Sequence, residues 1–414
     1  MRCMHRAIQR RSQGRHIMLT LKLAFRNILG AGLRTWLNVV SLSFAFVTII
    51  FLQGMYHAMN DQAEQATIDA LYGGGQYWQK DYDPFDPLSL TDAHSAIPAE
   101  LEPLVRANEA TPILIRQATI YPQGRFRTVL LKGIDPNQRI VSIPSSFLHA
   151  ESGTIPALIG TRMAKSTGLR KGDALTVQWR DVHGTFDARD VTIVEVFKTS
   201  VQEIDQEQLW IPLDQLQAIT RMPNEATVVV LSKSPLTAGQ GARPSTVSAG
   251  WEFKDLNFLL RDIHELVRTK NVGGAIMYSI LLFLAMLAIF DTQVLSIWRR
   301  KKEIGTLMAL GMTRTNVIGL FTLEGGCHAV MAAVVGALYG IPLLGYLAST
   351  GIALPSAADS IGFAIGERIF PIYSAGLIAG TTILVSIVTT IVSFLPSRRI
   401  ADLKPTDALR GKLS

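Results

Sequence analysis

Four long apolar segments dominate the pattern of hydrophobic and polar positions along the chain. Each is longer than about 18 residues and nearly free of charge, as an α-helix that crosses a bilayer must be. They cover residues 37–58, 272–297, 317–347 and 372–395. The first is too long for the apolar region of a cleaved signal peptide and lacks a small-residue cleavage site. The pattern therefore predicts four membrane-spanning helices.

A long mixed stretch, residues 59–270, separates the first two apolar segments. It begins with a helical pattern that stops at the glycines of 73–75 and ends in a helical pattern that continues into the second span. Between them, short runs typical of strands are separated by turn residues, as at the Pro-Gln-Gly turn of 122–124. The stretch is long enough for one large domain or two small ones. We expect an α+β domain held on two helical stalks.

The positions of Lys and Arg predict which side of the membrane each connection faces. The leader, residues 1–36, carries eight basic residues and no acid, and the 298–316 loop carries five basic residues against Glu303. The tail, 396–414, is also basic, whereas the 348–371 loop has one basic residue. Both termini and the 298–316 loop are therefore predicted to be cytoplasmic, in a multi-pass protein of the inner (plasma) membrane. The fold class is a membrane protein with four transmembrane α-helices per chain and a large α+β extracytoplasmic domain, periplasmic in position, between helices 1 and 2.

Composition supports this assignment and changes how the net charge is interpreted. Only 18% of the residues are charged and 48% are hydrophobic, whereas a soluble domain has about 25% charged residues. The formal net charge of +7 follows from basic residues at the ends of the spans. It is a topology signal, and no nucleic-acid partner is predicted.

The leader contains a short amphipathic pattern at residues 19–30, with apolar positions on one helical face and basic positions on another. This favours a helix lying along the inner membrane surface before the first span. The alternative is a simple extension of that span. We interpret Met18 as the natural start of the protein, because residues before it carry no recognisable pattern.

Sites for catalysis, nucleotides and metals are absent from the sequence. It contains no G-x-x-x-x-G-K-[ST] motif, so it does not bind ATP through a P-loop, and no G-x-S-x-G elbow. His264-Glu265 does not complete an H-E-x-x-H motif, and no zinc spacing occurs. Asp205 and Glu207 are interpreted as a solvated face rather than as a catalytic pair. We predict no catalytic residue, no metal and no cofactor in this chain.

Two acidic residues fall within the predicted spans, Asp291 near the inner surface and Glu324 about two turns into the third span. Burial of a carboxylate at a span centre costs about 2.5 kcal/mol or more. Both residues are therefore expected to face other helices or interfacial water. They serve a function, or they snorkel to the nearby surface or pair with a basic anchor there. That cluster comprises Arg299, Arg300, Lys301 and Lys302.

Small residues at a spacing of four predict close helix contacts within the spans. Gly336 and Gly340 have this spacing in the third span, and Gly376 and Gly380 have it in the fourth.

The segment "RRKKEIGTLMALGMTRTNVIGLFTLEG", residues 299–325, resembles the signature of a known permease family. The family includes the lipoprotein-releasing permeases of the LolC/LolE type, the macrolide exporter MacB and the cell-division permease FtsX. Its signature is a basic run, "EIG.L.ALG", a short turn and an apolar helix with "EG" near its start. The tail "LPSRRIADLKPTDALR" and the opening "LAFRNILGAGLRTWLNVVSLSFA" resemble the family's ends, so the resemblance extends over the whole chain from about residue 19.

The resemblance implies a helix that docks on a separate cytoplasmic ABC ATPase. Two copies of that ATPase would bind ATP and Mg and would drive a dimer of permeases, alike or different, by mechanotransmission. The apolar side chains of this helix have no membrane to enter, which also favours a protein partner, and Gly311 suits its C-terminal stop. The predicted ATPase-coupling helix comprises Glu303, Ile304, Gly305, Leu307, Met308, Leu310 and Gly311.

Within the family, the external domain is most similar to the lipoprotein-releasing branch. "LIGTRMAKSTGLRKGDALTVQW" and the segment that follows resemble that branch, but Lys198-Thr199-Ser200 departs from its usual Thr-Gly step. The resemblance implies release of lipoprotein or other lipophilic cargo, with a periplasmic acceptor or adaptor as a further partner. Two alternatives stay open: a regulatory permease that controls an external envelope hydrolase, and adaptor-linked export of a small toxic compound.

Overall fold

The computed structural model describes residues 33–149, 153–233, 247, 250–353 and 368–398. The predicted interfacial helix at 19–30, Met18 and nearly all of the tail lie outside these residues. The chain divides into two compact units. The first combines residues 1–58, 269–352 and 370–414, and the second combines 59–268 and 353–369.

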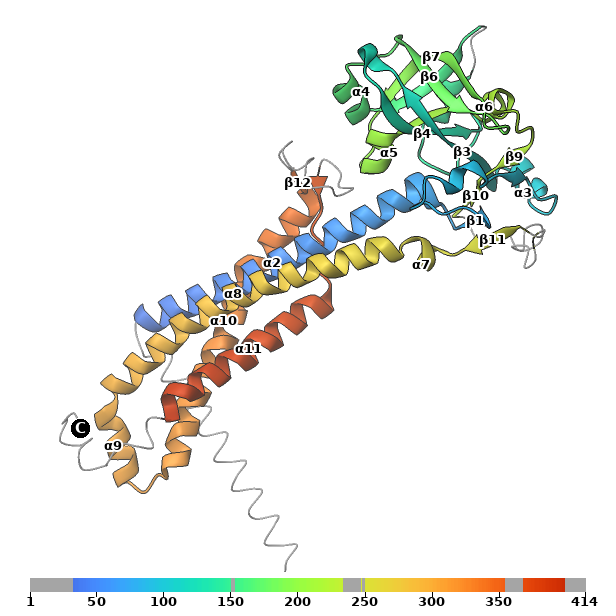
Figure 1. Cartoon of the computed structure of the whole chain (residues 1–414). Helices are drawn as coiled ribbons and strands as arrows, with labels where there is room; N and C mark the ends of the chain where they lie inside the picture. Colours follow the sequence, from blue (N-terminus) through green and yellow to red (C-terminus); the bar gives the residue numbers. More distant parts are fainter. Residues whose placement is uncertain (1–32, 150–152, 234–246, 248–249, 354–367, 399–414) are drawn as a thin grey trace, which may run out of the picture. The chain divides into compact units, whose positions relative to one another are not determined.

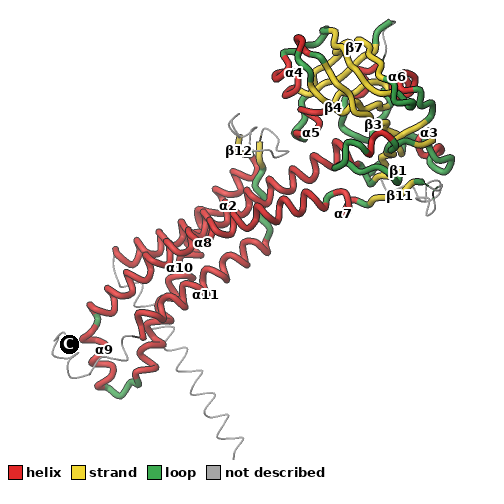
Figure 2. Tube along the Cα trace, in the orientation of Figure 1, coloured by secondary structure: helices red, strands yellow, loops and turns green. Residues whose placement is uncertain are grey.

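The first unit is built from helices long and apolar enough to cross a membrane (Figures 1 and 2). The four long helices are α2 (Leu33–Thr67), α8 (Arg261–Arg299), α10 (Arg314–Thr350) and α11 (Ala375–Ser397), and a short helix, α9 (Lys301–Ala309), lies between α8 and α10. α2 and α8 both extend well past the predicted spans, because their polar stalk segments keep the helical backbone. A two-stranded sheet, β12 (Ile352–Ala353) and β13 (Arg368–Ile369), follows α10 in the chain.

Side chains from all four long helices form the core of the membrane unit. Phe46 of α2, Ile289 of α8, Ala332 of α10 and Val385 of α11 belong to one buried cluster. Many large apolar side chains of α8, α10 and α11 remain exposed, as on Leu338, which is 75% exposed. Such a surface suits hydrocarbon rather than water, and four spanning helices are therefore the natural interpretation.

The second unit is a sheet-rich domain inserted between α2 and α8, which confirms the predicted fold class. Its main sheet has nine strands in the order β11-β1-β10-β3-β4-β8-β5-β7-β6. The strands are β1 (Gln76–Gln79), β3 (Ala110–Ile120), β4 (Arg127–Ile134), β5 (Ile155–Gly160), β6 (Ala174–Arg180), β7 (Phe186–Phe197), β8 (Gln208–Pro212), β10 (Val228–Leu231) and β11 (Trp251–Lys254). β2 (Ser95–Ala96) and β9 (Glu225–Ala226) form a separate pair.

An additional pairing of β3 with β6 closes six of these strands into a ring, in the order β3-β4-β8-β5-β7-β6. Alternate side chains point into the ring, where Leu131, Ile159, Val177 and Trp179 form a buried core. The opposite face of β3, β4, β8 and β5 builds a second cluster with Ile115, Leu158 and Trp210. The two faces follow from the two-residue period of a strand.

Short helices connect the strands and cover the ends of the sheet. They are the π-helix η1 (Ile68–Tyr72), the 3-10 helices η2 (Ser89–Thr91), η3 (Pro122–Gly124) and η4 (Ser145–Leu148), and the α-helices α3 (Glu102–Arg106), α4 (Thr161–Thr167), α5 (Gln202–Glu207), α6 (Leu213–Thr220) and α7 (Leu256–Leu259). The predicted turn at 122–124 therefore does separate two strands, β3 and β4.

The glycines at 73–75 end the first stalk, as predicted. The Gly73 N–H donates to the carbonyl of Ile68 at 2.7 Å and closes the π-helix. The Gly74 N–H then donates to the Leu231 carbonyl at 2.7 Å, and a Cβ at Gly74 would meet the Ser232 carbonyl oxygen at 2.1 Å. Only a residue without a side chain allows this close approach to β10.

The interpretation of Asp205 as a solvated acid is wrong, although Glu207 is exposed. Asp205 is 3% exposed, and its carboxylate accepts the Arg162 N–H at 3.2 Å. It packs against Gly160, where a Cβ would meet the Asp205 backbone at 2.4 Å. Burial raises the pKa of this carboxyl, and the hydrogen bond from the Arg162 N–H opposes that rise.

Candidate functional site

The predicted coupling segment forms a separate short helix. The backbone bends at Arg300, which has φ −95° and ψ 15°, and α9 runs from there to a cap at Leu310. Gly311 has φ +95°, its N–H donates to Met308, and the Met312 N–H donates to Leu307, each at 3.1 Å. This pair of bonds is a Schellman motif with glycine in the left-handed position. Gly311 therefore ends the helix as its place in the sequence predicts.

The inner side of α9 packs against its own chain. Ile304 is fully buried and clusters with Ile297 of α8 and with Val317 and Phe321 of α10. Leu307, Met308 and Met312 contact the edge of this cluster, and Gly305 is buried as well. Part of the apolar face expected to need an external partner is thus already covered by the chain itself.

The outer side of α9 remains accessible. Leu310 is 80% exposed, the highest exposure among the large hydrophobic side chains that the structure describes. Around it, the exposed residues of the same turn region are Lys302, Glu303, Thr306 and Ala309. The outer side of α9 therefore presents one exposed leucine among polar neighbours.

An ion pair ties the start of α9 to the third long helix. The Arg300 Nη1 lies 2.9 Å from Glu324 Oε2 and 3.1 Å from Glu324 Oε1, and its Nε lies 2.7 Å from Glu303. The Arg300 guanidinium also stacks over the Phe321 ring at 4.9 Å. Glu324 is only 6% exposed. Of the two interpretations left open for Glu324, pairing with the basic anchor is the one found here.

The other members of the basic anchor are less constrained. Lys301 Nζ lies 4.0 Å from the centre of the Trp298 ring, while Arg299 and Lys302 are exposed. Asp291 is exposed in the single chain, and within the described residues it has no ion pair or hydrogen bond. Of the two environments expected for Asp291, other helices or interfacial water, its exposure favours interfacial water.

Among the residues that the structure describes, only one of the two glycine pairs packs against another helix. A Cβ at Gly336 would lie 3.4 Å from the Ser43 carbonyl oxygen, and one at Gly340 would lie 2.8 Å from Val47, so α10 and α2 approach closely there. Gly376 and Gly380 face outward, and in the described chain a Cβ at Gly380 would meet nothing within 4 Å. The spacing predicts close contact but does not say which side of a helix is covered.

A further close contact between helices, at Gly325, was not predicted from the sequence. A Cβ at Gly325 would lie 2.3 Å from Ser393 Cβ and 2.0 Å from Ser393 Oγ, so α10 meets α11 at this glycine. Gly325 is the glycine of the "EG" step of the sequence signature. Gly325 directly follows Glu324, which pairs with Arg300, and this position in the sequence is what could have predicted the contact.

The fold and this site together define a class of protein. Four spanning helices, a sheet-rich domain after the first, and a short helix with an accessible outer side between the second and third form the layout of an ABC permease. Residues 275–405 match the family described as FtsX-like permease C-terminal.

Comparisons with individual proteins extend this match. The lipoprotein-releasing system transmembrane protein LolC of Neisseria meningitidis serogroup B is 21% identical over 323 residues, which cover 73% of this chain and 77% of LolC. The macrolide export ATP-binding/permease protein MacB of Psychrobacter cryohalolentis is 26% identical over 123 residues, 30% of this chain and 16% of MacB. The extracellular domain of the noncanonic ABC-type transporter YknZ from Gram-positive bacteria covers 39% of this chain and 83% of that domain, at 14% identity and a TM-score of 0.24. The chain is therefore similar to the ABC transporter permeases LolC and MacB, and its residues 275–405 match the FtsX-like permease family.

Proposed function

We propose that this chain is the membrane subunit of an ATP-driven complex that releases lipoprotein or other lipophilic cargo from the inner membrane. Two copies of a separate cytoplasmic ABC ATPase bind ATP and Mg and act on a dimer of permeases, alike or different. The termini and α9 face the cytoplasm, and the sheet-rich domain faces the periplasm, where an acceptor or adaptor receives the cargo. The similarity to LolC over most of both chains supports the choice of cargo.

The observation that carries this proposal is the division of α9 into two sides. Ile304 fixes the inner side to α8 and α10, and Arg300 pairs with Glu324 of α10. Leu310 leaves the outer side open to a partner. A push on Leu310 would therefore move the long helices rather than bend a loose loop.

Co-purification tests the docking of an ATPase. The full chain is purified from native membranes, and bound proteins are identified by mass spectrometry. We expect an ABC ATPase with the wild type and a loss of about tenfold or more with Leu310→Asp, because a charge would then face an apolar groove. Val182→Asp is the matched control, since Val182 is also exposed but lies in the sheet-rich domain. Undiminished ATPase recovery with Leu310→Asp would reject the docking role.

Site-specific photo-cross-linking tests the cargo. A photoreactive residue replaces Phe44 of α2 or Leu284 of α8, which are 67% and 56% exposed in the single chain. By analogy with the family, these two helices line the cavity between protomers. Cross-links to lipoprotein would support the proposal. Cross-links to phospholipid alone, with an envelope hydrolase captured from the domain surface instead, would favour the regulatory alternative.

Cysteine accessibility tests the orientation. Cysteines introduced at Asp190 in the domain and at Thr306 of α9, both exposed, are treated in intact cells with a membrane-impermeant maleimide. We expect labelling at position 190 and protection at position 306. The reverse pattern would invert the proposed topology.

A further inference from the structure

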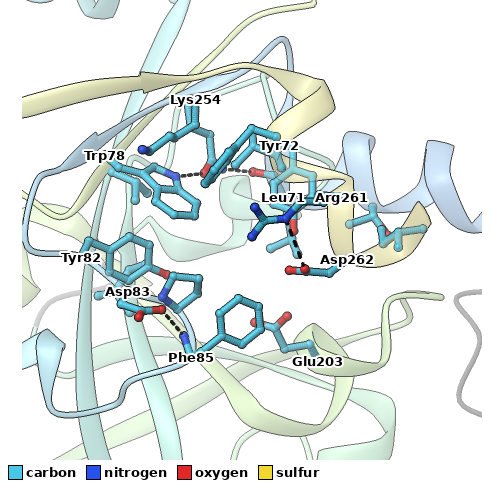
Figure 3. A pocket seen from close by; sticks show the side chains of 18 of the residues that line it. Leu71, Tyr72, Trp78, Tyr82, Asp83, Phe85, Glu203, Lys254, Arg261 and Asp262 are labelled. Carbon is cyan, nitrogen blue, oxygen red and sulfur yellow. Dashed lines mark hydrogen bonds and ion pairs between the residues drawn. The ribbon is translucent and has the colours of Figure 1, made fainter. Parts of the chain in front are cut away.

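A cavity of about 790 Å³ lies within the sheet-rich domain unit. Its walls come from the end of α2, η1, the 80–85 loop, the region of Glu203 and the start of α8 (Figure 3). This volume is in the range of sites that enclose drug-sized molecules, about 300–1,000 Å³. None of the sites discussed above uses it.

One face of the main sheet forms the floor of the cavity. Strand register places Ile115 of β3 opposite Lys132 of β4, and Lys132 opposite Trp210 of β8. Val228 of β10 stands opposite both Ile113 of β3 and Trp78 of β1. Because residues opposite each other point to the same face, these side chains line a continuous floor. All of them line the cavity.

Aromatic rings build the wall above this floor. The Trp78 ring lies edge-on to Tyr82, with ring centres 5.0 Å apart, and edge-on to Phe258 at 5.9 Å. Phe85 stands across from them in Figure 3 and is 74% exposed. Rings in such arrangements offer faces and edges to a flat, ring-containing molecule.

Most polar groups around the cavity are satisfied by the chain itself. The Trp78 indole N–H donates to Gln76 at 2.6 Å, and Lys254 donates to Glu252 at 2.7 Å. Glu203 accepts a hydrogen bond from Gln208 at 2.8 Å. These groups hold the shape of the site but need nothing from a ligand.

Two hydrogen-bond donors on the floor of the cavity, on Lys132 and Trp210, have no acceptor in the described chain. Lys132 is 6% exposed, and among the described residues its ammonium has no hydrogen bond or ion pair; it lies 5.3 Å from the centre of the Trp210 ring. Trp210 is 1% exposed, and its buried indole N–H has no acceptor in the described chain. Burial lowers the pKa of Lys132, while Glu203 partly opposes this. Buried donors without partners are unfavourable, and an apolar residue in place of Lys132 would avoid the cost.

We propose that this cavity binds an amphipathic carboxylate, whose oxygens accept hydrogen bonds from Lys132. Its ring-containing body lies between Trp78, Tyr82 and Phe85. The bound acid supplies the hydrogen-bond and charge partner that the Lys132 ammonium lacks in the described chain. This site is separate from the proposed lipoprotein cargo between the spans, so one can be disproved without the other.

Photolabelling of the full chain in lipid nanodiscs tests the proposal. The probe is 4-benzoylbenzoate, which combines two rings, a photoreactive ketone and one carboxylate. We expect saturable labelling that maps by mass spectrometry to peptides containing Trp78, Tyr82 or Phe85. Benzophenone, which lacks the carboxylate, should label these peptides at least about tenfold less.

Variants separate binding from folding. Lys132→Met keeps the volume and removes the donor, and we expect a loss of affinity of about tenfold or more. Lys165→Met is the control, because Lys165 is an exposed lysine of α4 outside the cavity. Thermal melting checks that Lys132→Met is at least as stable as the wild type.

Competitors identify the apolar body of the ligand. Displacement of the probe by 2-naphthoate would support a ring-containing acid. Stronger displacement by palmitate would overturn the ring assignment in favour of an acyl chain. Equal labelling of the wild type and Lys132→Met, or labelling confined to the spanning helices, would overturn the site itself.

Discussion

Replacing Gly325 by alanine should separate α10 from α11. The added Cβ would stand 2.3 Å from Ser393 Cβ. Ser393 cannot avoid it by changing rotamer, because the position of a Cβ is set by the backbone. Ser393 is also fully buried, and its hydroxyl donates to the Thr389 carbonyl at 2.9 Å. Only a movement of the two helices relieves the contact.

The size of that movement sets the expected cost. Carbon atoms in ordinary contact lie about 3.5–4.0 Å apart, so the helices must move apart by more than about 1 Å. Overpacking of this kind typically costs 1–3 kcal/mol. Since the backbones themselves must shift, we expect about 3 kcal/mol for Gly325→Ala. Gly326→Ala is the matched control, because its Cβ would lie 3.1 Å from Thr390 Oγ1, a contact that a small shift relieves, and we expect about 1 kcal/mol or less.

A double-mutant cycle with Ser393→Gly tests the explanation. Ser393→Gly alone should cost about 1 kcal/mol, because glycine in a helix interior is unfavourable. In the double variant the clash is absent, so its stability should equal that of Ser393→Gly alone. The free energy of unfolding is measured by titration with SDS in mixed micelles and followed by circular dichroism. Additive losses in the double variant would refute a steric origin, and so would wild-type stability of Gly325→Ala.

Three further predictions concern single groups. Glu324→Gln should lower the free energy of unfolding by about 1–3 kcal/mol, because Arg300 loses a buried partner but keeps Glu303. A coupling energy near zero in a double-mutant cycle with Arg300→Met would argue against the ion pair. Gly311→Ala should lower the free energy of unfolding by about 1–2 kcal/mol through backbone strain alone, since the added Cβ meets nothing within 4 Å of the described chain. Gly319→Ala, inside α10, should leave the free energy of unfolding unchanged or raise it. Lys132→Met should raise the melting temperature of the unliganded chain at pH 7, and the difference from the wild type should shrink toward pH 10. The reason is that the folded lysine has a lowered pKa and binds a proton less readily than the unfolded lysine, so the wild type gains stability as the pH rises. A difference in melting temperature that stays constant with pH would contradict the lowered pKa.

Sequence patterns predicted the fold class because each signal was local. The length of an apolar segment predicts a spanning helix, and a glycine that takes the left-handed region ends a helix, as Gly311 ends α9. The turn at 122–124 and the stop at 73–75 are likewise encoded within a few residues. The ring closed by β3 and β6 was not predictable in this way, since it pairs Ile120 with Val177 across a long stretch of chain.

The candidate sites show the same limit. The position of α9 followed from its sequence, but its inner side did not, because Ile304 is covered by residues of two other helices. Asp205 was misinterpreted because its burial depends on Gly160 and Arg162, which precede it by more than 40 residues. Nothing in the local sequence distinguishes Lys132, because only strand register places it beside Trp210.

The order of strands in the main sheet has a consequence for biosynthesis. β1 is the first strand to be made, yet both of its neighbours, β10 and β11, lie about 150 residues or more further along the chain. At 5–20 residues per second, β1 waits on the order of ten seconds or longer with both edges unpaired. An unpaired strand is open to pairing with other chains. The nascent protein, already inserted through α2, therefore passes through an interval in which protection of residues 76–79 by a chaperone would increase the yield of folded permease.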